Sequence, residues 1–174
     1  MRAQGHTDIP LNETGWRQAE LLGKRMSGET WDVVYSSDLG RALETARKAV
    51  EQHGLVIATD IRLREVYLGE VEGTTEEERL DRWGPRWKEL DLGQESRDSV
   101  ARRGVQALAD YADRHPGKRI LVVSHGGWIG NTMKKLVPHF ETSMHLQNTS
   151  VTLVRRTEHG RWECDLFNCT RHLV

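Results

Sequence analysis

The chain has 174 residues, of which 37% are hydrophobic and 29% are charged. This length suffices for one hydrophobic core and is short for two, so we expect a single domain over residues 1–174. Acidic and basic residues nearly cancel to a formal net charge of −1. No overall positive field therefore indicates a nucleic acid or an anionic membrane as partner.

Location and metal binding are constrained by what the sequence lacks. It shows neither the apolar region of a signal peptide nor the run of about 18 apolar residues that spans a membrane. Cys164 and Cys169 are the two cysteines, and their spacing fits neither a zinc site nor a CxxC redox pair. We expect a cytoplasmic protein without a metal site.

The first third of the chain alternates between helical and strand patterns. Apolar residues at helical spacing predict a helix from Thr14 to Met26, with Asn12 or Thr14 as its N-cap. The run WDVVYSS (31–37) predicts a buried strand, residues 41–54 predict a helix closed by a glycine, and LVIATD (55–60) predicts a second strand.

The middle of the chain is less regular. Residues 74–96 are highly charged and are interrupted by glycine and proline, which predicts short helices in an insertion at about 74–98, outside the central sheet. A longer helix is predicted from Ser99 to Arg114, with apolar residues along its inner face.

The strongest pattern is RILVVSHGGWIGNTMKKLV, at 119–137. A continuous apolar strand followed by a helix is typical of a parallel sheet that helices cover on both faces. The runs SVTLVRRT and RWECDLFN, separated by EHG, then predict an antiparallel hairpin. These elements favour an α/β three-layer sandwich with a mixed, mostly parallel central sheet.

Ligands of open α/β sheets bind where strands turn into helices, and one such turn carries Arg41. A cation at a helix N-terminus opposes the local helix dipole, whereas an anion held between Arg41 and the helix would be favourable. The alternative is an ordinary exposed arginine.

Two further turns carry ionisable groups. His125 is followed by two glycines and a helix N-terminus, whose free N–H groups could bind phosphate; the alternative is a structural histidine. Glu65 follows a strand and has the basic neighbours Arg62 and Arg64. A carboxyl near an anion could have a raised pKa and act as a general acid, although a solvated carboxylate is the simpler interpretation.

Six motifs along the chain are QGHTDIPLNETG, SSDLGRALETA, LREVYLGEVEG, GQES, VVSHGG and NTS. In this order, over nearly the whole chain from Gln4 to Leu173, they resemble the histidine phosphatase superfamily, also called phosphoglycerate mutase-like. The resemblance implies that fold. It also implies phosphoryl transfer through a phosphohistidine, on small phosphorylated metabolites, without a metal or organic cofactor.

The resemblance assigns a role to each turn. Arg41 matches the arginine that binds the phosphoryl group, His125 the second pocket histidine that stabilises it, and Glu65 the general acid that protonates the leaving oxygen. Gln4, His6 and Thr7 match a loop that borders the pocket and can touch substrate. These roles suit a reaction whose transition state needs positioning and electrostatic stabilisation of phosphoryl oxygens.

The chain departs from the family at its start. Family members begin with a strand ending in Arg-His-Gly, whose histidine is the nucleophile, and no such motif occurs here. The sequence could be a truncated form of an ordinary enzyme, the interpretation we favour, or a binding protein that holds a phosphorylated ligand without turnover. A third interpretation makes His6 the nucleophile, but a loop histidine lacks the rigid strand end that in-line attack requires.

The missing strand lies in the middle of the family's sheet. Its loss would leave unpaired backbone groups in the core, each costing about 1–3 kcal/mol, in a domain stable by only about 5–15 kcal/mol. We therefore expect the gap to be filled, either by a second subunit in a strand-exchanged homodimer or by residues 1–13.

The insertion bears on the substrate. Mutases of the family carry a long insertion that shields the phosphoenzyme from water, and here the insertion is short. A phosphatase is therefore favoured over a phosphoglycerate mutase, with small phosphate monoesters or inorganic phosphate as ligands. Trp83 and Trp87 could admit aromatic substrates, but we expect them to be packing residues.

Overall fold

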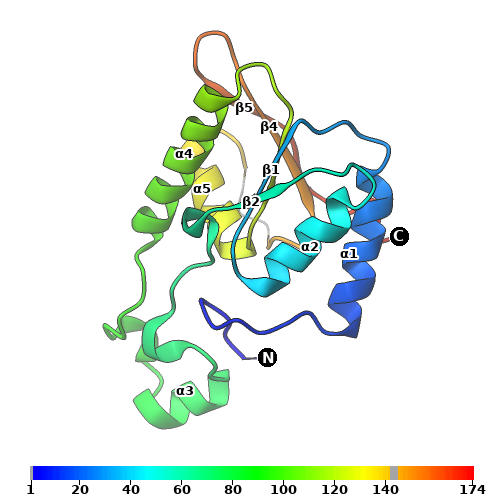
Figure 1. Cartoon of the computed structure of the whole chain (residues 1–174). Helices are drawn as coiled ribbons and strands as arrows, with labels where there is room; N and C mark the ends of the chain where they lie inside the picture. The colour runs from blue at the N-terminus through cyan, green and yellow to red at the C-terminus, as the bar shows by residue number, and fades with distance from the viewer. Residues whose placement is uncertain (1, 142–144) are drawn as a thin grey trace.

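The structure is a computed structural model that describes residues 2–141 and 145–174 (Figure 1). Its α-helices are α1 (Glu13–Met26), α2 (Gly40–Val50), α3 (Glu76–Trp83), α4 (Arg97–Arg114) and α5 (Gly126–Leu136). Its strands are β1 (Val33–Ser36), β2 (Ile57–Thr59), β3 (Ile120–Val123), β4 (Val151–Arg156) and β5 (Trp162–Cys169). Short 3-10 helices are η1 (Ile61–Leu63), η2 (Gly69–Val71) and η3 (Trp87–Glu89).

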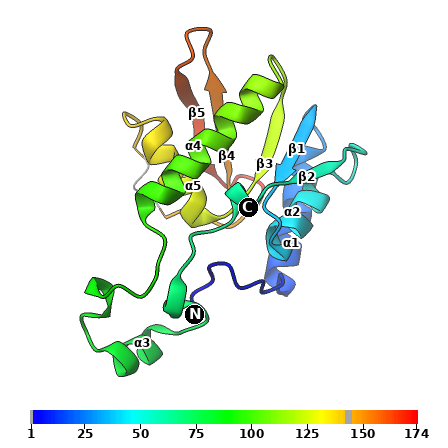
Figure 2. The ribbon, with the colours of Figure 1, turned by 60° about the vertical axis from the view of Figure 1, so that its left-hand side comes forward.

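A parallel sheet of order β2-β1-β3 forms the middle layer. Because side chains alternate along a strand, Val34 and Leu121 pack against α1 and α2 on one face. Their neighbours Tyr35 and Val122 pack against α4 and α5 on the other. Figures 1 and 2 show these helix pairs on opposite sides of the sheet, which confirms the predicted α/β three-layer fold.

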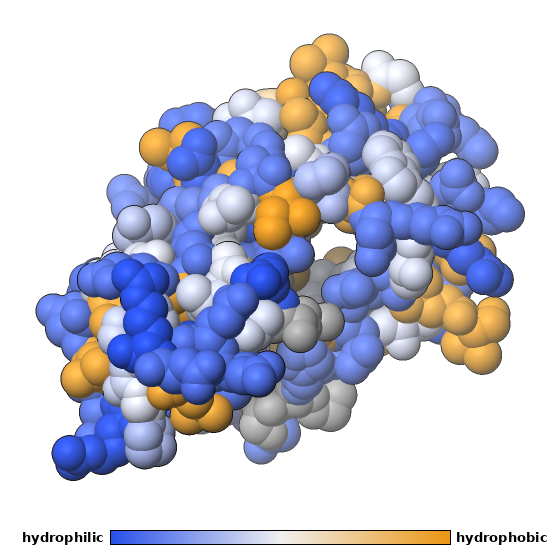
Figure 3. Space-filling model, turned by 90° about the horizontal axis from the view of Figure 1, so that it is seen from below, coloured by the Kyte–Doolittle hydropathy of each residue, from blue (hydrophilic) through white to orange (hydrophobic). Residues whose placement is uncertain are grey.

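The expected single mixed sheet is wrong, because β4 and β5 form a separate antiparallel sheet. Among the described residues no strand pairs with the edge of β3 opposite β1. Nevertheless Leu121 of β3 and Val151 of β4 pack on the same apolar cluster beneath α1, so the two strands share a layer. Three of the four residues of β3 are only half-buried. Seen from below, the molecule has a hollow that reaches into it (Figure 3).

Our expectation that residues 1–13 fill the place of the missing strand is wrong for the described residues, because residues 2–12 contain no strand and Glu13 begins α1. Ala3 accepts a hydrogen bond from Gly73 N and donates one to Thr74 O, both at 2.9 Å. The Arg2 guanidinium binds the Glu78 carboxylate at the start of α3. Figure 2 shows the N-terminus beside the segment that contains α3.

Most predicted elements are present with shifted ends. Asn12 is the N-cap of α1, accepting from Gly15 N at 2.9 Å. The second predicted strand shortens to β2, an edge strand whose preceding Val56 is 89% exposed. The helix predicted at 41–54 ends at Val50, and a turn leads to Gly54 at φ +64°. The helix predicted from Ser99 begins two residues earlier, capped by Ser96.

The segment 74–98 contains α3 and η3, and it lies below the sheet in Figure 1. Trp87 is buried with Val71 and Leu92, and the Arg79 guanidinium stacks on its ring at 4.7 Å. Trp83 packs against the same cluster. The two indoles therefore serve packing, as predicted. In the part of the chain that the structure describes, no helix is long and apolar enough to cross a membrane.

Candidate functional site

The ends of β1 and β3 bring two turns together. Ser36 and Val123 are register partners in the parallel ladder, so the residues that follow them emerge at the same sheet edge, where α/β proteins bind ligands. A hydrogen bond of 2.9 Å joins His125 Nε2 to Ser37 Oγ. The predicted strand-end histidine thus meets the β1–α2 turn, and sequence analysis had given Ser37 no role.

His125 is held in a buried, uncharged state. Its side chain is 8% exposed, and it precedes the first residue of α5. Burial, together with the positive charges of Arg41, His6 and Arg103, lowers the pKa of His125 to about 3. The imidazole is therefore neutral near pH 7, and a nearby anion would favour its protonation.

Glu65 occupies the place that we had expected to be free for phosphate. Its Oε1 accepts from Trp128 N at 2.8 Å and from Val66 N at 2.9 Å, and its Oε2 accepts from Gly127 N at 3.0 Å. A Cβ on Gly127 would lie 2.5 Å from Glu65 Oε1, so this close approach requires a glycine. The α5 N-terminus is thus partly occupied, because the Glu65 carboxylate binds two N–H groups of its first turn, those of Gly127 and Trp128.

Arg41 lies in the first turn of α2, as predicted, and two of its nitrogens bind loop carbonyls. Its Nη2 donates to Gly5 O at 2.8 Å and its Nη1 to Thr7 O at 3.0 Å. The α2 N-terminus is taken by Asp8, whose Oδ1 accepts from Gly40 N at 2.7 Å. Burial lowers the pKa of Arg41, and the charges of Glu65, Asp8 and Glu72 oppose this shift.

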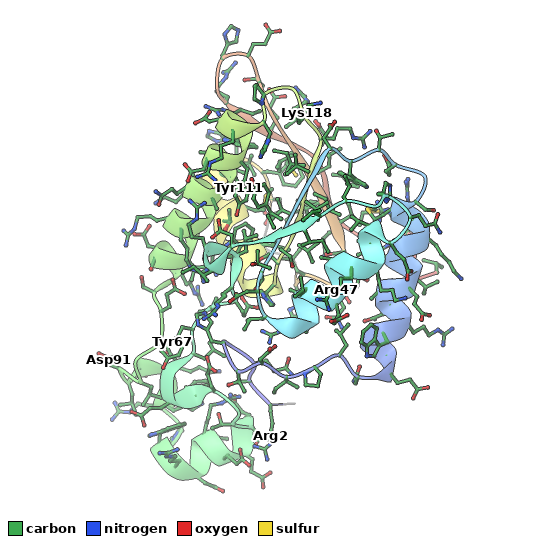
Figure 4. The ribbon with its side chains drawn as sticks, in the orientation of Figure 1. Arg2, Arg47, Tyr67, Asp91, Tyr111 and Lys118 are labelled. Carbon is green, nitrogen blue, oxygen red and sulfur yellow. The ribbon has the colours of Figure 1, made fainter. Side chains whose placement is uncertain are left out.

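The loop residues predicted to border the pocket, Gln4, His6 and Thr7, differ in their exposure to solvent. His6 is half-buried, and its Nε2 donates to Glu65 O at 2.8 Å, since a carbonyl can only accept. The centroid of its ring lies 5.3 Å from that of Tyr67. Tyr67 lies between the layer of the central sheet and the segment 74–98 that contains α3 (Figure 4). Thr7 is exposed and binds the Glu72 carboxylate. Gln4 is exposed.

Sequence reasoning missed the residues that hold the Glu65 loop. Arg103 of α4 donates to the carbonyls of Arg62, Arg64 and Glu65 at 2.6–2.9 Å. The same guanidinium pairs with Glu95 at 2.9 Å. The GQES motif, which contains Glu95, was the available signal. The second glutamate of EVEG, Glu72, was also quoted without a role.

A second ion pair supports the same loop. The guanidinium of Arg64 binds both carboxylate oxygens of Asp38, at 2.8 and 2.5 Å. Within residues 2–141 and 145–174 no group of three or more His, Cys, Asp or Glu side chains is arranged to hold a metal ion. The site offers a guanidinium, a neutral imidazole and a carboxylate, a set suited to binding an anion and moving a proton.

Known proteins resemble this chain over nearly its whole length. The family model described as histidine phosphatase superfamily (branch 1) matches residues 1–170. Phosphoglycerate mutase-like protein 4 of Arabidopsis thaliana is 34% identical over 183 residues, covering 99% of this chain and 80% of that protein.

Two solved structures share the fold. YhfR of Bacillus stearothermophilus superposes with a TM-score of 0.89 at 30% identity, covering 99% of this chain and 91% of that one. A mycobacterial glucosyl-3-phosphoglycerate phosphatase, solved in complex with VO3, superposes with a TM-score of 0.85 at 29% identity, covering 97% of this chain and 91% of that one. The chain belongs to the histidine phosphatase superfamily (branch 1).

Proposed function

We propose that this site binds the phosphoryl group of small phosphate monoesters, for phosphatase-type transfer through a phosphohistidine in the intact family. The observation that carries the proposal is that Arg41 interacts electrostatically with both Glu65 and His125. Phosphatases among the similar structures support the choice of reaction.

Each group has a role that follows from its contacts. Arg41 uses two of its N–H groups on the loop, and the remaining ones can donate to phosphoryl oxygens. Neutral His125 can donate to another oxygen and take up a proton as negative charge arrives. Glu65 Oε2 accepts one backbone N–H and Oε1 accepts two. To act as a general acid Glu65 must first take up a proton, and Oε2 is the oxygen more easily freed to carry it to the leaving group.

Binding is tested by titrating inorganic phosphate into the protein in a calorimeter. We expect binding that Arg41→Ala weakens about tenfold or more, the effect of losing a charge-assisted hydrogen bond. Arg47→Ala is the matched control, because Arg47 lies on the same helix and pairs with Glu44 away from the site (Figure 4). Equal losses in both variants would remove Arg41 from the proposed site.

Turnover is a separate question, because the 174 residues contain no Arg-His-Gly. We propose that the chain as given is impaired, hydrolysing p-nitrophenyl phosphate at background rate without an acid-labile phosphoenzyme. Robust turnover that His125→Ala abolishes would contradict this. If the histidine alone is lacking, adding an N-terminal strand that ends in Arg-His-Gly restores activity.

Two alternatives remain tied to specific observations. The name of the Arabidopsis relative favours a phosphoglycerate mutase, and transfer between positions of phosphoglycerate instead of release of phosphate would establish it. The second is a non-catalytic protein that binds phosphorylated ligands, which phosphate binding without turnover after strand addition would support. His6 is a poor nucleophile here, since its Nε2 carries the hydrogen donated to Glu65 O.

We also propose that the edge of β3 opposite β1, which pairs with no strand among residues 2–141 and 145–174, is filled by a second subunit in a strand-exchanged homodimer. The half-buried apolar residues of β3 support this, because pairing would bury them. Light scattering should then show a dimer. A monomer would exclude it.

A further inference from the structure

Glu72 accepts four hydrogen bonds near the site, and the proposed reaction gives it no part. It follows η2, and its Oε1 accepts from His6 N at 2.7 Å and from Leu68 N at 3.3 Å. Its Oε2 accepts from Thr7 N at 2.8 Å and from Thr7 Oγ1 at 2.5 Å. One carboxylate thus binds two successive peptide N–H groups of the N-terminal loop.

Arg41 binds the other side of the same loop. Its two terminal nitrogens donate to the carbonyls of Gly5 and Thr7 at 2.8 and 3.0 Å. The peptide groups of residues 5–7 therefore lie between a carboxylate that accepts from their N–H groups and a guanidinium that donates to their carbonyls. A Cβ at Gly5 would lie 2.3 Å from Glu72 Oε1, so this packing requires the glycine.

These contacts restrict the side chain of Arg41. A free arginine samples many rotamers, and holding it in one costs conformational entropy that a ligand must otherwise overcome. The loop removes that freedom by fixing two of the five N–H groups of Arg41. The loop can do so only while its own position is fixed, and Glu72 supplies the contacts that fix it.

We propose that Glu72 is a positioning residue for the phosphate site, holding the loop of residues 5–7 so that the loop carbonyls hold Arg41 ready for phosphoryl oxygens. The inference rests on the proposed phosphate site. Glu72 does not touch the ligand in this proposal, because a carboxylate beside a phosphoryl group would repel it. Its effect reaches the ligand through Arg41.

The ionisation of Glu72 agrees with this geometry. Burial acts to raise the pKa of Glu72, but the hydrogen bonds from the Thr7 hydroxyl and from the N–H groups of His6, Leu68 and Thr7 lower it on balance. The carboxylate is therefore charged at neutral pH, the form that accepts from all four donors.

The test is a double-mutant cycle on the affinity for inorganic phosphate, measured by calorimetry on the full chain. The four proteins are the wild type, Glu72→Gln, Arg41→Lys and the double variant. Arg41→Lys keeps a positive charge but loses the planar fork, so weak binding stays measurable. Glu70→Gln is the control for charge, because Glu70 is exposed on η2 and lies 3.9 Å from Arg82.

We expect Glu72→Gln to weaken phosphate binding about tenfold, as for the loss of charge-assisted hydrogen bonds, and Glu70→Gln to leave it unchanged. In the Arg41→Lys background the effect of Glu72→Gln should fall below about twofold, since coupled residues are not additive. Glu72→Asp, which keeps the charge, should recover part of the affinity and serves if the glutamine variant does not fold.

Other outcomes are decisive in different ways. An equal loss from Glu72→Gln in both backgrounds, or no loss in either, would overturn the positioning role while leaving the phosphate site intact. A wild-type protein that binds no phosphate would overturn the proposed function first and the positioning role with it. Amide hydrogen exchange at His6 and Thr7, faster in Glu72→Gln than in the wild type, reports the loop contact independently of the ligand.

Discussion

The two helices that begin at the site, α2 and α5, each receive a carboxylate at the N-terminus, but from very different surroundings. Gly40 N of α2 donates to Asp8, an exposed residue of the N-terminal loop. Gly127 N and Trp128 N of α5 donate to Glu65, whose own backbone is held by Arg103. In both helices a carboxylate binds N–H groups that have no partner within the helix. At α2 this carboxylate is exposed, and at α5 it belongs to a network of largely buried side chains.

The difference indicates which end of the site can admit an anion. Displacing Glu65 would disturb contacts that reach from α4 through the Arg103–Glu95 pair, whereas displacing Asp8 would disturb one exposed hydrogen bond. A phosphoryl group should therefore enter beside α2 and Arg41, while Glu65 stays in place at the start of α5.

The largest expected effect on stability comes from Arg103→Ala, which removes the guanidinium that holds the Glu65 loop. The side chains of Arg103 and Glu95 are only 18% and 16% exposed, and truncation leaves a buried carboxylate and several carbonyls without donors. We expect the free energy of unfolding to fall by about 3–5 kcal/mol, measured by urea denaturation.

Arg102→Ala is the matched control for that experiment. Arg102 is the preceding residue of α4, and its guanidinium forms an exposed pair with Asp98. Exposed pairs contribute little to stability, so no measurable change is expected. Comparable losses in the two variants would mean that the Arg103 network does not stabilise the α5 side in particular.

The fold and the centre of the site were predictable because their signals are local. The continuous apolar run before His125 indicates a buried strand, and the glycines after it indicate a turn into a helix, which is what β3 and α5 show. Arg41 was identified because a cation at a helix start needs an explanation. In each case the residues that carry the signal are neighbours in the sequence.

The supporting residues were not predictable, because their contacts join distant segments. Glu72 binds His6 across 66 positions, and Arg103 binds Glu65 across 38. A glutamate or arginine in a charged stretch is usually solvated, and nothing in the local pattern distinguishes these. The division into two sheets was missed for the same reason. Whether β3 and β4 pair by hydrogen bonds depends on how distant segments are placed, and the local pattern of each strand does not show this.

The buried state of His125 gives the next prediction, an acid-sensitive stability. The pKa of His125 is about 3 in the folded chain against 6.5 ordinarily, so between these values the unfolded chain binds a proton that the folded chain does not. Stability should fall as the pH drops from about 6.5 toward 3, by at most about 1.4 kcal/mol per pH unit.

Unfolding curves at several pH values test this against a variant that lacks the group. In His125→Gln the slope over that range should become shallower. His159→Gln, at the exposed β4–β5 turn, should keep the wild-type slope. If the wild type and His125→Gln lose stability in parallel, His125 is not held neutral by the fold.

The smallest effect concerns the exposed cap at α2 and tests whether that end admits the anion. Asp8→Ala removes the acceptor of Gly40 N and should cost about 1 kcal/mol of unfolding free energy, the amount typical of losing a side-chain acceptor at a helix N-terminus. It should nevertheless strengthen phosphate binding several-fold, because the charge of Asp8 opposes an anion beside Arg41. Asp8→Asn separates the two effects, since it keeps an acceptor but removes the charge. It should leave stability nearly unchanged and bind phosphate as tightly as Asp8→Ala. If both variants bind phosphate more weakly than the wild type, Asp8 is part of the binding site and the anion does not enter beside α2.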